Sequence, residues 1–539
     1  MNVPPPSVRS PRRRFDRLLA LAPVVLYGLC AAAWFSAGVG YQTDEGLYVE
    51  SAAFVLHGGS SPSAPVLSDW VAAHGRRWPL MVMPYVGTVK ALVALPLFAI
   101  FGVNPVVARI SGILLGGLGI AGLLALLAAR VRPAAGLLAG SLLAVHPSYL
   151  DFTVFDNGGA SVWMGAMGLL ALALTHHLSR GSKRSAFLLG AAAGAGIWGR
   201  ANFLWLIAAA VVGAVLGFGR AALPRRNHFL AIAAGGLFGG LPLLAYEAGS
   251  RLGTWSFFLG ARNAWSPGAA AARLRMLAQT LVGDVEQRAV WAGPAPPAWQ
   301  WKAGAVLLLL AAASFLVPAG APYPDLARWR RALAAAAATL TVLLATSRLP
   351  VAEHHLVAIL PLAAAAVSVG ALEAFERRAA IRPVIAALLS AWALVSLAGD
   401  ARTVRGLART GGRGFWSSAL DDAARYLRAH PVPVSRLKIV SWGLQKNLYI
   451  SSGTAVYGKE IYWNATRQRA ASGLPWDAEL RDGGTFLLMT PSAGAESLDG
   501  AADGFARALR DYSGSREERV FRDTAGEPVV RLIEIPPQP

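Results

Sequence analysis

The sequence predicts an α-helical polytopic membrane protein with about eleven transmembrane helices and a small soluble α/β domain at its C-terminal end. Of its 539 residues, 55% are hydrophobic and only 15% are charged, whereas a soluble domain carries about a quarter charged residues. Apolar stretches of about 20 residues, the length that crosses a bilayer, recur through the first 400 positions. From there on the composition becomes charged and mixed, as a soluble domain requires.

The apolar runs are assigned as spans in chain order. The first, 18–40, follows Arg12, Arg13, Arg14 and Arg17, and we expect a retained first span with its N-terminus in the cytoplasm. Ten further runs are expected to cross the membrane: 107–129, 134–150, 158–176, 186–200, 203–219, 229–247, 301–318, 332–347, 355–372 and 382–399.

A further apolar stretch, 85–102, is interrupted by Lys90 and Pro96. If it does not cross, the later arginine clusters fall on the same side as the basic N-terminus, and if it crosses, all of them move outside. Because cytoplasmic loops collect Lys and Arg, we expect 85–102 to be a helix lying on the outer membrane surface. The same topology explains the net charge of +20 without a nucleic-acid partner.

This topology divides the chain into two domains. Residues 1–399 form a transmembrane domain with outer loops 41–106 and 248–300, the second holding a helix around 273–282, and residues 400–539 form a domain on the periplasmic side of a bacterial inner membrane. In the C-terminal domain we expect helices at 421–429 and 501–509 and strands at 437–441, 485–489, 518–521 and 528–533.

The most informative motif lies at the outer end of the first span, where Asp44 and Glu45 are adjacent. One interpretation is structural, with Asp44 as the N-cap of a helix over 46–57. The other is catalytic, since a carboxylate kept anionic by a helix N-terminus can accept a proton from a hydroxyl as that hydroxyl attacks an electrophile. The residues alone do not decide between them.

Other polar residues are expected on the same outer side. Asp151 and Asp156 follow the short turn after the third span and are either a polar turn or part of a site. Cationic side chains converging on an outer cavity would bind a lipid phosphate, although each alone also fits a headgroup anchor that extends to the interface. The cationic candidates are Arg76, Arg77, Lys90, Arg109 and Arg200.

A late segment adds Arg348, Glu353, His354 and His355 at another outer span boundary. Adjacent His residues point about 100° apart on a helix, so they rarely bind one metal ion together. Contacts to a phosphate or a sugar and an interfacial cap remain the alternatives.

The motif Thr43-Asp44-Glu45-Gly46 with Tyr48, a surface helix ending in Phe101-Gly102, and Arg109 opening the next span together resemble the polyprenyl-phosphate-sugar-dependent glycosyltransferases of the GT-C superfamily. The nearest branches are the protein O-mannosyltransferases and the lipid A aminoarabinose transferases. The resemblance implies a GT-C type fold, catalysis at Asp44 with Glu45 beside it, a second acidic position at Asp151 or Asp156, and lipid-phosphate contacts from Arg348, His354 and His355. The proline pair of the protein O-mannosyltransferases is absent, since Trp78-Pro79 or Met83-Pro84 stands there instead.

The resemblance implies a glycosyltransferase that moves a sugar from a polyprenyl-phosphate donor to an acceptor hydroxyl on the outer face, in a single displacement with inversion. The expected partners are this lipid donor, membrane lipids, and an acceptor that is a lipid, a glycan or a protein. No cofactor is required, with a divalent metal near the acidic cavity as an open alternative. The rival function is a transporter or membrane scaffold, which would place its ionisable residues near the bilayer midplane.

Overall fold

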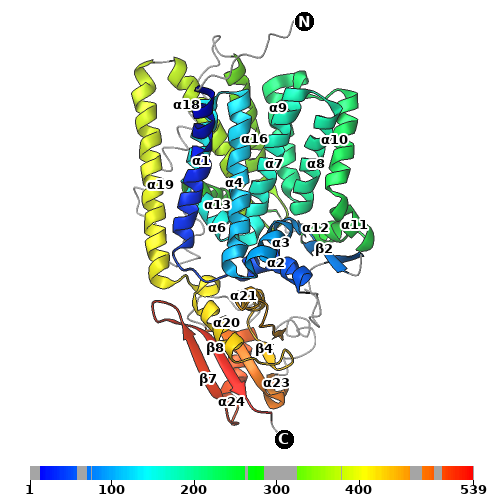
Figure 1. Ribbon diagram of the computed structural model, residues 1–539, viewed down its shortest axis with the longest axis vertical. Helices are drawn as coiled ribbons and strands as arrows, with labels where there is room; N and C mark the ends of the chain where they lie inside the picture. Colours follow the sequence, from blue (N-terminus) through cyan, green and yellow to red (C-terminus); the bar gives the residue numbers. More distant parts are fainter. Residues whose placement is uncertain are drawn as a thin grey trace.

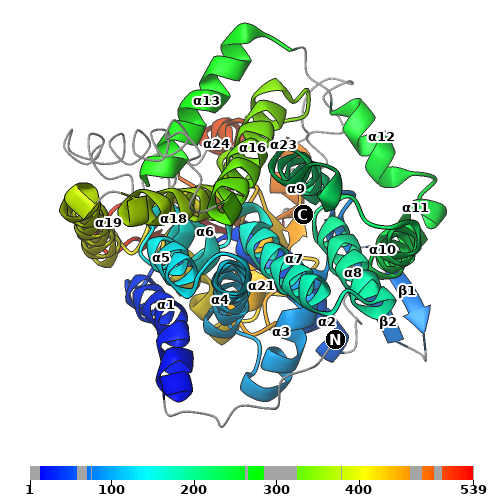
Figure 2. The same ribbon diagram turned by 90° about the horizontal axis from the view of Figure 1, so that it is seen from above.

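A computed structural model describes residues 12–57, 69–73, 76–261, 265–283, 324–377, 379–461, 476–490 and 501–537. Figure 1 shows a bundle of long helices with a smaller α/β domain beneath one end of it. Seen from above, helices α4 and α7 lie inside the bundle, and α12, α13 and α19 lie at its periphery (Figure 2). The two predicted parts, a helical bundle and a C-terminal α/β domain, are therefore both present.

The described helices of the bundle and its surface are α1 (Arg12–Phe35), α2 (Thr43–Leu56), α3 (Val89–Phe101), α4 (Pro105–Arg130), α5 (Pro133–Ala144), α6 (Pro147–Val154), α7 (Ala160–Arg180), α8 (Lys183–Gly199), α9 (Phe203–Phe218), α10 (Arg226–Gly239), α11 (Leu241–Gly249), α12 (Gly253–Gly260), α13 (Pro267–Val282), α16 (Pro324–Thr346), α17 (Glu353–Leu356), α18 (Ile359–Arg377) and α19 (Arg382–Thr410). Short 3-10 turns η1 (Asn157–Gly159), η2 (Gly219–Ala222) and η3 (Ala379–Ile381) join some of them.

Five helical segments in the described part of the chain are long and apolar enough to cross a membrane, and a sixth is counted if the bent pair α10 and α11 is one span. The predicted count of eleven is therefore not confirmed. Three expected spans form helices that are shorter or less regular: α5 has 12 residues, α8 has 17, and α10 and α11 are bent by 61°. The expected span 301–318 lies outside the described residues.

Large apolar side chains cover the outside of the bundle, including Leu114, Leu216, Leu237 and Leu394. In water such a surface would be costly, whereas lipid tails solvate it. Inside the bundle, helices approach through small residues. A Cβ atom added to Gly122 of α4 would lie 2.2 Å from the carbonyl oxygen of Gly168 in α7, so this crossing requires glycine, as is common between membrane helices.

The C-terminal domain holds a five-stranded sheet in the order β5-β4-β6-β8-β7. Strands β4 and β6 are parallel, and β8 is antiparallel to both β6 and β7. Helices α20, α21, α23 and α24 accompany the sheet, with η4 (Gly414–Trp416) before them. The elements are α20 (Ala419–Ala429), β4 (Leu437–Ile439), α21 (Gln445–Ser451), β5 (Lys459–Glu460), α23 (Trp476–Asp482), β6 (Gly484–Met489), α24 (Ala501–Asp511), β7 (Glu517–Arg522) and β8 (Pro528–Ile535).

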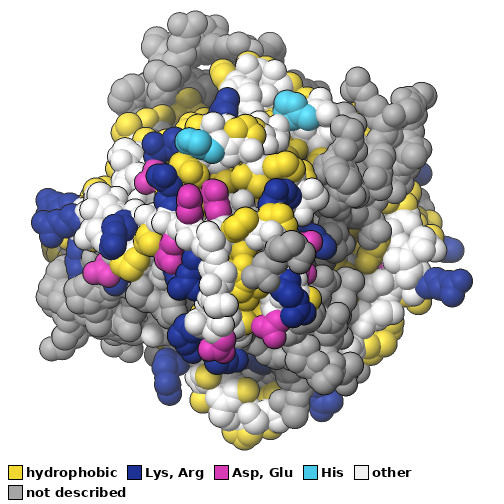
Figure 3. Space-filling model, turned by 90° about the horizontal axis from the view of Figure 1, so that it is seen from below, with side chains coloured by type: hydrophobic (Ala, Val, Ile, Leu, Met, Phe, Trp, Pro, Cys, Tyr) yellow, Lys and Arg dark blue, Asp and Glu magenta, His cyan; other side chains and the backbone are white. Residues whose placement is uncertain are grey.

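All six elements that the sequence predicted in this domain are present with small shifts at their ends. One boundary differs, because α19 continues as a single helix through residue 400 to Thr410. The polar segment 400–410 thus extends the last bundle helix into the domain. Figure 3 shows the molecule from below, on the side where the domain points away from the bundle. Basic and acidic side chains are interspersed there, as on a water-facing surface.

The first large loop folds against the end of the bundle beside this domain. It contains α2, α3 and a three-stranded antiparallel sheet in the order β1-β2-β3, formed by β1 (Asp69–Ala73), β2 (Arg76–Met83) and β3 (Val86–Gly87). Helix α3 is the predicted surface helix, and it lies beside α2 at the end of the bundle (Figure 1). One apolar cluster joins Phe54 of α2 and Phe98 of α3 to Tyr449 and Tyr457 of the C-terminal domain.

Candidate active site

The acidic motif lies at the first turn of α2. The N-cap of this helix is Gln42, whose side-chain oxygen accepts from the backbone N–H groups of Asp44 and Glu45, while the Glu45 carboxylate accepts from the backbone N–H of Gln42. This reciprocal capping satisfies the first turn without the Asp44 side chain. Of the two interpretations of Asp44, the one that makes it the N-cap is therefore wrong, and its carboxylate is available for other contacts.

Glu45, predicted as a catalytic residue beside Asp44, is held in a buried ion pair. Its two carboxylate oxygens accept from Nε and Nη2 of Arg109 at 2.7 and 2.8 Å, and both side chains are buried. Arg109 also donates to the carbonyl oxygens of Val39 and Gly40. Because these contacts occupy both groups, Arg109 ties the start of α2 to α4 and is not free to bind a phosphate.

Asp44 lies in a different environment, although it is the next residue. Its carboxylate accepts a hydrogen bond from the backbone N–H of Gly158 and lies near the guanidinium of Arg200. Burial raises the pKa of Asp44 to about 6, and the Gly158 hydrogen bond and the Arg200 charge oppose that shift. A carboxyl group with this pKa is anionic at neutral pH and is more basic than an ordinary aspartate.

Lys90 and Asp156 form a buried ion pair next to this position. Lys90 Nζ of α3 lies 2.6 Å from Asp156 Oδ2, and each side chain is only 1% exposed. The other oxygen of Asp156 accepts from the backbone N–H of Ser161 at 2.6 Å. The turn that carries Asp156 continues into Gly158 and Gly159, both with positive φ, so it places Asp156 and the N–H that binds Asp44 together.

Arg200 supplies a buried and incompletely paired cation. Its side chain is fully buried, and among the described residues neither Nε nor Nη1 has a hydrogen-bond partner. Nη2 lies 3.3 Å from Nε2 of His355. His355 Nδ1 accepts from the backbone N–H of Ala352, so in the neutral ring Nε2 carries the hydrogen. Both facing groups are then donors, and an anionic acceptor would satisfy them.

The remaining predicted residues are less central. His354 packs against Gly158, where an added Cβ would meet its ring at 2.4 Å, and its ring lies 4.2 Å from that of His355, centroid to centroid. Arg348 is exposed in the segment before α17 and has none of the hydrogen bonds described for this cluster. Arg76 and Arg77 lie on β2, paired in register with Ala73 and Ala72 of β1.

The fold resembles that of a transferase of known structure. ArnT from Cupriavidus metallidurans, a lipid A aminoarabinose transferase, matches in its apo state with a TM-score of 0.59 at 15% identity, over 94% of this chain and 97% of ArnT. The form of ArnT bound to undecaprenyl phosphate matches with a TM-score of 0.60 at 15% identity, over 95% and 98% of the two chains. The chain has the GT-C fold.

Other comparisons are less informative. The archaeal oligosaccharyltransferase AglB from Archaeoglobus fulgidus, in complex with an inhibitory peptide and a dolichol-phosphate, matches with a TM-score of 0.45 at 13% identity, over 94% of this chain and 79% of AglB. No family model matches the sequence, and no curated protein sequence matches it. The likeness is therefore one of fold, and activity has to be argued from the site.

Sequence reasoning missed parts of this candidate site. Tyr85, half-buried in the turn before β3 and stacked on Phe257 at 4.7 Å, lies close enough to Asp44 and Arg200 to interact with both charges. Gly158 was also missed. The pair Gly158-Gly159 directly after an Asp-Asn sequence was a usable signal, since such a sequence indicates a tight turn with positive φ.

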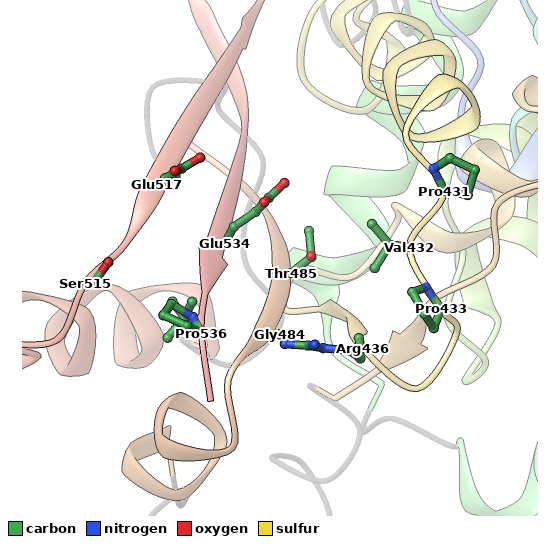
Figure 4. Close-up of a pocket in the computed structure, with 11 residues that line it drawn as sticks. Pro431, Val432, Pro433, Arg436, Gly484, Thr485, Ser515, Glu517, Glu534 and Pro536 are labelled. Carbon is green, nitrogen blue, oxygen red and sulfur yellow. The ribbon is translucent and has the colours of Figure 1, made fainter. Parts of the chain in front are cut away.

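A metal cluster and a second groove were also sought as candidate sites. In the described part of the chain, no three His, Cys, Asp or Glu side chains are grouped to hold a metal ion. A groove in the C-terminal domain is lined by Arg436, Thr485, Glu517 and Glu534 among others (Figure 4). It lies at the amino ends of the parallel strands β4 and β6, whereas α21 follows the carboxyl end of β4, so the groove is separate from Asp44.

Proposed function

We propose that this chain is a membrane glycosyltransferase that moves a sugar from a polyprenyl-phosphate donor to an acceptor hydroxyl, with Asp44 as the general base. One observation carries the proposal. A carboxylate that is not used to cap its helix lies near a buried cation that has too few hydrogen-bond partners. Asp44 lies in the first turn of α2, and Arg200 is the residue directly after α8. Their charges interact electrostatically. The fold is that of ArnT, which has been described bound to undecaprenyl phosphate.

The reaction needs few groups. In a single displacement the acceptor oxygen forms a bond to the anomeric carbon, the bond from that carbon to the phosphate oxygen breaks, and the electron pair leaves with the polyprenyl phosphate. The proton of the acceptor hydroxyl passes to Asp44, which must be anionic to accept it. Attack opposite the leaving group inverts the anomeric centre.

The leaving phosphate gains negative charge as the bond breaks. We assign the stabilisation of this charge to Arg200 and His355, whose facing donors would both bind one anion. Lys90, which forms an ion pair with Asp156, lies close to them. Preorganised cations in a buried site stabilise such charge more effectively than in water. Arg348, an exposed residue, is assigned to the headgroup region, and a metal ion is not needed for this scheme.

The position of the site favours a transferase over the rival transporter. Helices α2 and α3, which carry Asp44 and Lys90, lie at the end of the bundle beside the C-terminal domain (Figure 1). A transporter places such groups near the bilayer midplane on broken helices. We propose that this end faces the periplasm of a bacterial inner membrane, with the N-terminus in the cytoplasm, and that the acceptor, a lipid, glycan or protein, approaches there.

Native mass spectrometry of the detergent-purified protein tests the donor class. We expect a bound polyprenyl phosphate, either co-purified or added as undecaprenyl phosphate, and its loss in Arg200→Met. If the wild-type chain binds added undecaprenyl phosphate no better than the variant does, the donor assignment is wrong.

A further inference from the structure

Helix α2 is held from two opposite sides. At 3.6 residues per turn, Asp44 and Gly46 point about 200° apart. Asp44 and Tyr48 form one stripe, which faces the bundle: Asp44 binds Gly158, and a Cβ added to Gly159 would lie 3.2 Å from the Tyr48 ring. Gly46, Glu50 and Phe54 form the second stripe, at spacings of four residues, on the opposite side of the helix.

The second stripe contacts the C-terminal domain. Glu50 pairs with Lys446 of α21 at 2.9 Å, with side chains 1% and 9% exposed. Phe54 stacks on Tyr449 with ring centroids 5.0 Å apart and meets Tyr457 at 6.2 Å. Every residue of the stripe that has a side chain is therefore engaged by the domain.

Gly46 sets how closely α2 and α21 approach. A Cβ atom at this position would lie 2.8 Å from the carbonyl oxygen of Lys446. Because that atom belongs to the backbone, it cannot move aside as a flexible side chain would. The separation between the two helices is thus fixed at the turn that follows Asp44.

We infer that α21 of the C-terminal domain is a clamp that sets the position of Asp44, and that Lys446 is its principal positioning residue. The inference rests on the proposed function for its catalytic meaning. Lys446 touches neither Asp44 nor the proposed phosphate site and acts through Glu50 and the α2 backbone. A buried ion pair is suited to this task, since it fixes one register between two surfaces that apolar contacts alone would leave free to slide.

The clamp explains why the α/β domain is joined so closely to the bundle. Helix α2 is short and begins just after the chain leaves α1, so its own hydrogen bonds do not fix its orientation. Glu45 and Arg109 hold its first turn against α4, and α21 holds the rest against the site. Displacing a general base by about 1 Å is enough to lower a rate by about 100-fold.

The test compares Lys446→Met with Lys438→Met in the full-length protein. Lys438 is likewise a buried lysine, and it forms ion pairs with the more exposed carboxylates of Glu479 at 2.7 Å and Asp482 at 2.5 Å, entirely within the C-terminal domain. We expect Lys446→Met to speed amide hydrogen exchange across residues 43–56 and to lower kcat by about 10- to 100-fold with an unchanged KM for the lipid donor. Lys438→Met should leave both quantities unchanged, and Lys446→Arg should recover most of the loss.

Unchanged exchange in α2 of Lys446→Met, or equal effects of Lys438→Met, would overturn the clamp. Faster exchange with an unaltered kcat would show that the contact is structural only and would overturn its positioning role. Gly46→Ala gives a second variant that does not alter any charge, and it should also lower kcat with an unchanged KM. Absence of transfer in the wild-type protein would contradict the proposed function instead, because the exchange measurement does not depend on activity.

Discussion

The guanidinium of Arg200 lies 3.3 Å from Nε2 of His355, and the hydrogen bond that His355 Nδ1 accepts from Ala352 leaves both facing groups as donors. Two donors do not satisfy each other. Arg200 also has two nitrogens without a partner in the part of the chain that the structure describes, and its side chain is fully buried. Buried polar groups in folded proteins are nearly always paired, so this pair of residues is best explained by an anion that both bind.

Arg200→Met should weaken binding of undecaprenyl phosphate by about 10- to 150-fold, because a charge-assisted hydrogen bond contributes about 1.5–3 kcal/mol. The same variant should melt at an unchanged or higher temperature, since it removes an incompletely paired buried charge. Lipid titration and thermal denaturation in detergent measure the two effects. Arg348→Ala is the control and should change neither, and a large drop in the melting temperature of Arg200→Met would indicate a structural arginine.

Lys90→Met should be strongly destabilising, by about 3–5 kcal/mol, because it leaves the carboxylate of Asp156 buried without its cation. Adding Asp156→Asn should restore much of the stability, since Asn tolerates the positive φ of 45° at this position and keeps an acceptor for Ser161. Denaturation midpoints of the single and double variants check this. If the single variant is as stable as the wild type, the pair does not hold α3 against η1.

Glu45→Gln should act on stability more than on chemistry. It breaks the two-oxygen ion pair with Arg109, and removing one partner of a buried pair costs about 3–5 kcal/mol. Protein that remains folded should keep most of its transfer rate per molecule. The transfer rate divided by the folded fraction separates the two effects. If this normalised rate falls as far as that of Asp44→Asn, Glu45 is a catalytic residue after all.

The transfer rate should rise with pH through about 6 and become constant above it. Asp44 accepts a proton only when it is ionised, and its pKa is raised to about 6. The free energy of unfolding should change in the opposite direction. A carboxyl group with a raised pKa binds its proton more tightly in the folded protein than in the unfolded chain. The contribution of Asp44 to stability therefore falls as the pH rises from the ordinary pKa of an aspartate through about 6. A pH–rate profile with its acid limb near 4 would contradict the raised pKa.

Most of the C-terminal domain could be predicted from the sequence, because its strands and helices follow hydrophobic periods and turn residues that lie within a few positions of each other. The spans were harder to count. The bend between α10 and α11 and the short α5 depend on packing against neighbouring helices, which a run of apolar residues does not reveal.

The sequence named residues that the structure brings together, but it did not show the contacts that each of them makes. Asp44, Lys90, Asp156, Arg200 and His355 were all named, since buried charges at a membrane boundary stand out. The sequence could not show that Gln42 caps α2, that Glu45 and Arg109 neutralise each other, or that Lys446 reaches Glu50 from 396 residues away. The two ion pairs join distant segments of the chain, and the choice of Gln42 over Asp44 as the cap depends on the backbone geometry at the start of α2.

The variant Asp44→Asn decides whether Asp44 is the general base. Gln42, not Asp44, caps the helix, and Asn has nearly the size of Asp, so the variant should fold and melt at least as well as the wild type. We expect release of polyprenyl phosphate from a polyprenyl-phosphate-linked sugar to fall by about 100-fold or more, which is the usual contribution of a general base. A well-folded Asp44→Asn protein that transfers sugar at a rate near that of the wild type would contradict the assignment.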